Sequence, residues 1–151
     1  MPAGGKNQVV RLRHDEALTR LRDSVHGVFS TVHPVRGVDT IPVVFAIDES
    51  WRVVIPIDLV KPKAMGRLQR ERNLDADPRA MLLVDRWDPD DWSKLWWVRA
   101  ELRYEATLGP LQWGGLAAQL SARYVQYADE PFARLLVLRI VGVTGWAGHD
   151  V

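Results

Sequence analysis

The stretch Trp51–Arg72, WRVVIPIDLVKPKAMGRLQRER, joins an apolar segment to a strongly basic one. Val53–Ile57 is rich in β-branched residues and is followed by Asp58, a pattern typical of a strand that ends there. One acid, Glu71, opposes the cations that follow, which are Lys61, Lys63, Arg67, Arg70 and Arg72. Free backbone amides at a helix start bind phosphate well, especially beside cations. We therefore expect an anionic small ligand, such as a phosphorylated cofactor, at this strand-to-helix turn.

These basic residues also have a plainer interpretation, which is a solvated face of a helix. Against it, Lys61 and Lys63 precede or begin the helix expected over Lys63–Leu74, and Arg67 lies one turn inside it. Arginine adds a bidentate geometry that lysine lacks. For Arg70 and Arg72 two interpretations stay open: contact with a longer anionic tail of the ligand, or simple solubility.

Composition indicates one globular domain with no general affinity for nucleic acid. The chain has 151 residues, is 47% hydrophobic and carries a net charge of +1, so its basic excess is local. Cysteine is absent, which excludes disulfides and thiolate metal sites. No apolar run reaches the roughly 20 residues of a membrane span, and the N-terminus lacks the apolar core of a secretory signal. We expect a disordered lead over 1–13, a folded domain over 14–151 and a cytoplasmic location.

Familiar catalytic and metal-binding patterns are missing from the sequence. The histidines are scattered, with no spacing that places two on one helix face, and they are His14, His26, His33 and His149. Neither a dinucleotide-binding or P-loop glycine pattern nor a nucleophile elbow is present. The sequence therefore predicts no metal site and assigns no catalytic residue.

Hydrophobic periodicity predicts a mainly antiparallel α+β fold. The expected helices are Asp15–Val28, Lys63–Leu74 and Pro110–Tyr124. The expected strands are Val28–Val32, Thr40–Ile47, Trp51–Ile57, Arg79–Asp85, Leu95–Thr107 and Arg134–Val143. The first three strands have short connections and should form a meander. A six-stranded antiparallel barrel, closed or nearly closed, with helices packed outside fits this order.

Two of these strands have distinct surfaces. Leu95–Thr107 alternates between apolar and charged residues, so one face should be buried and the other solvated. Within it, Trp96 and Trp97 point to opposite sides and cannot both face one pocket. Arg134–Val143 is apolar on both faces, so beyond the barrel core it needs a helix or a second subunit to cover it.

Several segments together resemble a known family: IPVVFAID, WRVVIPID, KPKAMGRLQRERNLDADPRAMLLVD and DWSKLWWVRAELRYE. The chain resembles the split β-barrel flavoproteins that include pyridoxamine 5′-phosphate oxidase. Within them it is most similar to the actinobacterial branch that uses the deazaflavin coenzyme F420. The resemblance spans Asp15 to Trp146, and its most specific motifs are K-x-K-x-x-x-R-L, D-P-R-A-x-L-L-V-D and D-W-S-x-L-W-W-V-R-A.

The resemblance implies a homodimer with the cofactor in a groove between the subunits. By this resemblance the phosphate would be held by Lys61, Lys63 and Arg67. The ring and ribityl region would be lined by Thr40, Ile41, Pro42, Pro56 and Ile57. Trp97 and Trp146 would lie at the far side of the groove.

The implied activity is that of an oxidoreductase, which passes hydride between F420 and an unidentified small organic acceptor. Two alternatives remain: the same fold holding FMN, or a carrier or sensor that binds F420 without turnover. Pyridoxamine phosphate oxidases carry Arg-Lys where this chain has Pro62-Lys63, and they end in a substrate-binding arginine motif that this chain lacks. Both departures argue against vitamin B6 oxidation.

Overall fold

The computed structural model describes residues 10–59 and 66–148, so Lys61 and Lys63 lie outside the described residues. Val10–Arg11 form a short strand, β1, although the sequence prediction assigned them to a disordered lead. Among the described residues, no helix is long and apolar enough to cross a membrane.

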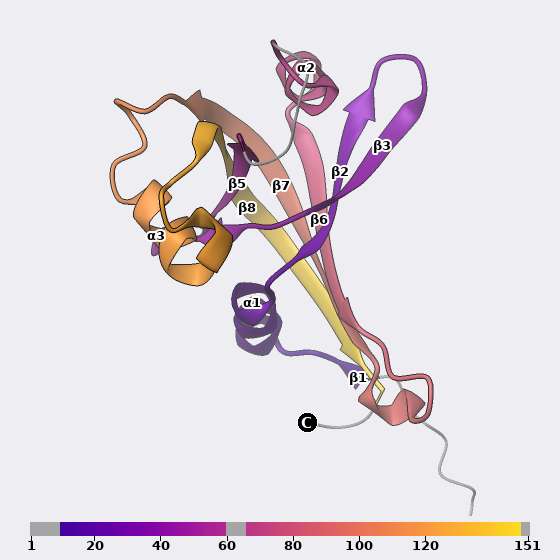
Figure 1. Ribbon diagram of the computed structural model, residues 1–151. Helices are drawn as coiled ribbons and strands as arrows, with labels where there is room; N and C mark the ends of the chain where they lie inside the picture. The colour runs from indigo at the N-terminus through magenta and orange to yellow at the C-terminus, as the bar shows by residue number, and fades with distance from the viewer. Residues whose placement is uncertain (1–9, 60–65, 149–151) are drawn as a thin grey trace, which may run out of the picture.

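The described strands form one antiparallel sheet of eight strands in the order β3-β2-β6-β7-β8-β5-β4, with β1 paired to β8 (Figure 1). Their bounds are β2 Gly27–His33, β3 Gly37–Val43, β4 Ala46–Ile47, β5 Arg52–Asp58, β6 Arg79–Arg86, β7 Trp96–Leu108 and β8 Phe132–Ala147. The six expected strands are all present. The count rises because β1 is added and because the strand expected over Thr40–Ile47 divides into β3 and β4.

The sheet is open between β3 and β4, which gives the barrel its split. These two strands are consecutive in the chain, yet they lie at opposite ends of the strand order. Only Val44 and Phe45 connect them, and β3 crosses the front of the sheet toward α3 (Figure 1). The expected three-stranded meander is therefore wrong: β2–β3 and β4–β5 are separate hairpins on the two edges of the split.

Three helices surround the sheet: α1 His14–Asp23, α2 Gln69–Ala76 and α3 Leu116–Arg123. Two 3₁₀ turns, η1 Trp92–Lys94 and η2 Val125–Tyr127, complete the described elements. Each helix is shorter than the sequence predicted. Helix α1 ends at Asp23, and β2 begins at Gly27. Glycine is needed at this first position of β2, since a Cβ atom there would lie only 2.8 Å from the Leu83 carbonyl oxygen. Val25 and Val28 lie beyond the end of α1 and are exposed rather than part of a buried helical stripe.

The core has two parts, on the two sides of β5 and β8. Inside the barrel, β7 contributes Val98, Ala100 and Leu102, while Arg99 and Glu101 face outward, which confirms the predicted alternation. In β8 all of residues 135–138 are buried. Leu136 and Leu138 enter the barrel core, whereas Leu135 packs under α3 and η2. A helix thus covers the outer face of β8, one of the two coverings that the sequence allowed.

Candidate functional site

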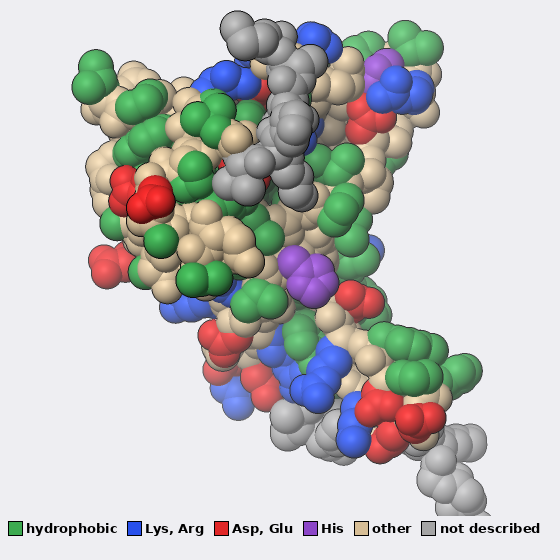
Figure 2. Space-filling view, viewed as in Figure 1, with side chains coloured by type: hydrophobic (Ala, Val, Ile, Leu, Met, Phe, Trp, Pro, Cys, Tyr) green, Lys and Arg blue, Asp and Glu red, His purple; other side chains and the backbone are tan. Residues whose placement is uncertain are grey.

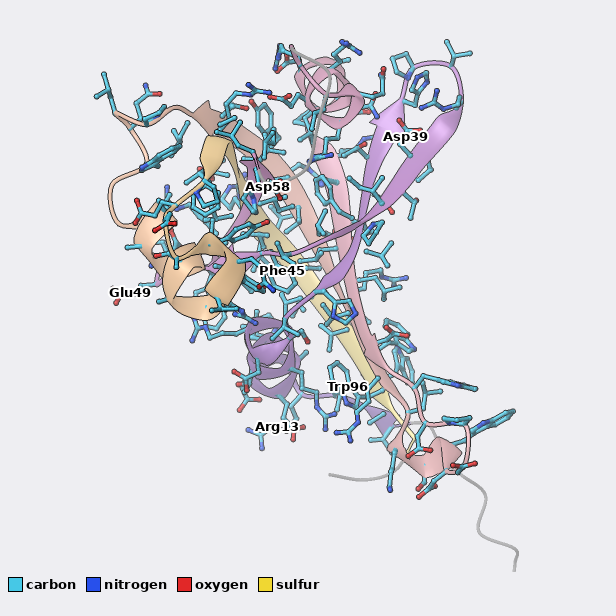
Figure 3. All side chains as sticks on the ribbon, viewed as in Figure 1. Arg13, Asp39, Phe45, Glu49, Asp58 and Trp96 are labelled. Carbon is cyan, nitrogen blue, oxygen red and sulfur yellow. The ribbon has the colours of Figure 1, made fainter. Side chains whose placement is uncertain are left out.

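A pocket with a volume of about 510 Å³ lies at the split of the barrel. Residues from β3, β5, α2 and the α3–η2 segment converge on it, and Figure 3 shows Asp58 in the space between α2 and α3. The lining residues are His26, Ile41, Pro42, Val43, Val44, Pro56, Asp58, Arg70, Tyr124, Gln126 and Tyr127. The pocket therefore depends on the opening between the two edge strands, because a closed barrel would pair these edges.

Three of the predicted ring-binding residues meet in this pocket: Ile41 and Pro42 from β3, and Pro56 from β5. Two others do not line it. Ile57 is buried in the barrel core, since side chains alternate along β5 and its neighbour Pro56 takes the pocket side. Thr40 is exposed, and its hydroxyl lies 3.1 Å from that of Ser30. The apolar side of the pocket is formed by residues of β3, its link to β4, and β5, which suits an organic ligand with apolar surface.

The polar end of the pocket holds Asp58, Arg70 and Tyr127. The Tyr127 hydroxyl donates a 2.8 Å hydrogen bond to Oδ2 of Asp58. Burial and this carboxylate raise the pKa of Tyr127 above its usual value, so the phenol keeps its proton. The Arg70 Nε atom is buried and has no hydrogen-bond partner among the described residues. Burial lowers the pKa of Arg70, while the negative charges of Glu71 and Asp58 act in the opposite direction.

Helix α2 is what turns Arg70 toward the pocket. Its other face is held by Glu71, whose carboxylate accepts hydrogen bonds from Arg134 Nε at 2.7 Å and from the Leu68 amide at 2.7 Å. Asn73 is fully buried and donates to Thr31 at 2.9 Å and to Asp39 at 2.8 Å. These bonds fix the helix against β2, β3 and β8.

Arg67 lies outside the pocket lining and before α2 begins, so its expected place one turn inside the helix is wrong. Its guanidinium forms an ion pair with Asp75 on the protein surface. This contact raises the pKa of Arg67. The predicted phosphate-binding lysines, Lys61 and Lys63, fall outside the described residues.

The tryptophans are spread over the molecule rather than gathered at the pocket. Trp97 and Trp146 are partners across β7 and β8, with ring centroids 6.5 Å apart. They lie at the end of the sheet marked by Trp96 in Figure 3, away from Asp58 and the pocket of the same chain. Trp87 and Trp92 are exposed on the loop between β6 and β7, where hydrophobic and acidic side chains crowd the lower right tip in Figure 2.

The side of the pocket formed by α3 and η2 was missed by the sequence analysis. The Tyr124 hydroxyl lies 2.7 Å from both the Val25 and Phe45 carbonyl oxygens and accepts a 3.2 Å bond from the Phe45 amide. It therefore ties α3 to the start of β2 and to the link between β3 and β4. The available signal was the helix expected over Pro110–Tyr124, which brings Tyr124 into the fold but does not indicate a pocket.

The donor chemistry of the site fits a flat organic group with a polar, electron-rich edge. Apolar and aromatic side chains form most of the lining, and Arg70 supplies a cation at one end. Among the described residues, no group of three or more His, Asp or Glu side chains could hold a metal ion. The site therefore suits a planar cofactor better than metal-assisted chemistry built from these side chains.

Neither a protein-family model nor a curated protein matches the chain. Solved structures do match the chain. Their sequence identities to it are low, so the matches are evidence for the fold and not for the function. A FAD-binding protein from Mesorhizobium loti is 17% identical, with a TM-score of 0.68 over 91% of this chain and 96% of that one. A FAD-binding protein from Mycobacterium smegmatis is 14% identical, with a TM-score of 0.56 over 92% and 97%. An F420 reductase is 21% identical, with a TM-score of 0.57 over 83% and 93%. The split-barrel α+β fold that the resemblance predicted is thus confirmed.

Proposed function

We propose that this chain is an oxidoreductase that binds a flavin-type cofactor, coenzyme F420 in the first instance, and passes hydride between it and a small organic acceptor. The observation that carries this proposal is the pocket at the split. It unites Ile41 and Pro42 of β3 with Pro56 of β5, two strands that lie near opposite ends of the strand order, and adds a cation on α2. Structural neighbours described as FAD-binding proteins and as an F420 reductase support a flavin or deazaflavin.

The cofactor would supply the hydride chemistry, and the protein would supply binding and orientation. In this proposal Ile41, Pro42 and Pro56 lie along the ring and ribityl chain, with Thr40 and Ile57 contributing backbone. Lys61, Lys63 and Arg67 hold the phosphate at the turn before α2. Tyr124 and Tyr127 close the pocket on the α3 side and exclude water from the ring.

We further propose that the working form is a homodimer. The outer face of β2 and β6 supports this, because Val28 and Leu83 are partners in register and are 36% and 38% exposed. A second copy would cover these apolar residues and could bring its own Trp97 and Trp146 toward the pocket. Sedimentation of the purified protein tests this; a monomer at micromolar concentration and above would contradict it.

Titration of the purified protein with F420 and with FMN tests the cofactor assignment. We expect tight binding of F420, which weakens as salt is added because the phosphate contacts are ionic. Lys63→Ala and Arg67→Ala should each weaken binding by about tenfold if they form charge-assisted bonds with the phosphate. Tight FMN binding without F420 binding would instead support the FMN alternative.

Turnover separates an enzyme from a carrier or sensor. Reduced F420 should be consumed when the protein is supplied with a panel of quinones, enones and tetrapyrroles. Tight binding without consumption across the panel would favour a non-catalytic carrier. In either case the protein binds the same cofactor at the same pocket.

A further inference from the structure

We infer that Arg70 is a cofactor-binding residue that donates hydrogen bonds to the negatively charged oxygen edge of the ring, not to the phosphate. This inference rests on the proposed function and deepens it, since it gives a role to a residue that the sequence left open between ligand contact and solubility. It also makes α2 part of the ring-binding site rather than only the end of a phosphate turn.

Arg70 differs from its basic neighbours in having a buried donor that no described residue satisfies. Its Nε atom is buried without a hydrogen-bond partner among the described residues, while its side chain lines the pocket. Arg72 lies two residues further along α2 and is exposed. It donates hydrogen bonds to Gln69 at 3.2 Å and to the Arg67 carbonyl at 3.0 Å. A buried donor without a partner is costly, and a ligand oxygen would remove that cost.

The nearby acids leave Arg70 available to a ligand. Glu71 is the adjacent acid, but its carboxylate is engaged by Arg134 and by the Leu68 amide. Asp58 shares the polar end of the pocket and accepts a hydrogen bond from Tyr127. Arg70 is therefore held at the pocket by its helix and not by an ion pair with Glu71.

The surroundings of Arg70 favour a ring edge over a phosphate. The residues that share the pocket with it include the apolar Pro42 and Pro56, which suit a ring better than a phosphate. The Asp58 carboxylate in the same pocket would repel a phosphate dianion through a partly desolvated medium. A ring oxygen that carries only part of a charge meets less repulsion there and can accept hydrogen bonds from the guanidinium.

This position would also adjust the electronics of the cofactor. Two-electron reduction of a flavin places negative charge on its pyrimidine nitrogen and neighbouring oxygen, so a fixed cation beside them stabilises the reduced form. Removing the cation should therefore lower the midpoint potential of the bound ring. A residue that only supported the fold would not produce this change.

The test compares Arg70→Met with Arg72→Met, a matched loss of charge from the exposed side of the same helix. The probes are FMN and riboflavin, and F420 and its phosphate-free chromophore. We expect Arg70→Met to weaken the phosphorylated and phosphate-free ligands alike, by about tenfold to a hundredfold. Arg72→Met should leave FMN and riboflavin binding unchanged, and bound FMN should have a lower midpoint potential in Arg70→Met than in wild type.

Two results would overturn the inference, and a third would overturn the proposed function. If Arg70→Met lost affinity only for the phosphorylated ligands, Arg70 would lie at the phosphate. Unchanged affinity in Arg70→Met would remove it from the site, whereas a wild-type protein that binds none of the four ligands would contradict the proposed function itself. Arg70 has a buried donor without a hydrogen-bond partner among the described residues, so its replacement by methionine removes an unfavourable buried polar group and Arg70→Met should fold. If it does not, Arg70→Lys serves instead: lysine keeps the charge but lacks the planar donor fork of the guanidinium, so wild-type affinity for riboflavin would contradict the hydrogen-bonding role.

Discussion

The two sides of the pocket are fastened to the sheet by different chemistry. Helix α2 is held by buried polar groups, chiefly the Glu71–Arg134 ion pair and the Asn73 hydrogen bonds. Helix α3 is held mainly by apolar packing of Ala117 and Leu120 on the second core cluster. The difference teaches that the cationic side of the pocket depends on charge and pH, whereas the aromatic side depends on buried volume.

Loss of the buried ion pair should have the largest effect. Glu71→Ala leaves Arg134 without its partner, and we expect the free energy of unfolding to fall by about 3 to 4 kcal/mol. Chemical denaturation measures this change. The matched control is Asp75→Ala, a substitution in the same helix as Glu71. It breaks the exposed ion pair between Asp75 and Arg67 and should change stability little. Equal effects of the two variants would show that burial does not distinguish these pairs.

Truncation under α3 should come next. Leu120 is fully buried, so Leu120→Ala should lower the free energy of unfolding by about 2 to 3 kcal/mol through lost burial and a residual cavity. The effect should not vary with pH, even in acid, where that of Glu71 variants should change. A clear pH dependence would contradict the mainly apolar attachment of α3.

Removal of one hydroxyl should have a smaller effect. Tyr124→Phe keeps the ring but deletes the hydrogen bonds to the Val25 and Phe45 backbone, at a cost of about 1 kcal/mol. Amide hydrogen exchange should then quicken at the link between β3 and β4 while the barrel core stays protected. Unchanged exchange at that link would show that Tyr124 does not hold it in place.

The smallest effect is a difference in acid sensitivity. Burial acts to raise the pKa of Glu71, but Arg134 and the Leu68 amide outweigh it and hold the pKa below 4.5. A carboxyl with a lowered folded-state pKa contributes stability above its unfolded value and loses it as pH falls through the folded value. The unfolding free energies of wild type and Glu71→Gln, measured at a series of pH values, should therefore converge as pH falls through the lowered folded-state pKa of Glu71. A constant difference would contradict this linkage.

Much of the fold was predictable from the sequence, because the alternation of apolar and polar residues along a strand corresponds to its buried and exposed faces in the folded sheet. The alternation in β7 was confirmed, and in β8 the predicted burial on both faces holds for residues 135–138, whereas Val141 is exposed. The meander prediction failed because pairing depends on partners distant in sequence: β5 pairs with β8, not with β3. Nothing local in the Thr40–Ile47 segment reveals that its two halves join opposite edges of the sheet.

The pocket was predictable only in part. Ile41, Pro42 and Pro56 were named from the resemblance, and they do line a common pocket. Arg70 was left open between contact with a ligand tail and simple solubility, because the sequence alone does not tell which side of the helix faces the pocket. Tyr127 and Asp58 are 69 residues apart, so no local pattern could predict their hydrogen bond.

The position of β8 has a consequence for the order of folding. This last strand of the described chain pairs with β1, β5 and β7, so it joins the two halves of the sheet. The β2–β3 hairpin can form early from local contacts, but the pocket cannot take shape until residues 132–147 have been synthesised. During translation the β4–β5 hairpin and the part of the sheet that contains β7 would thus stay unpaired with each other until the final strand binds both.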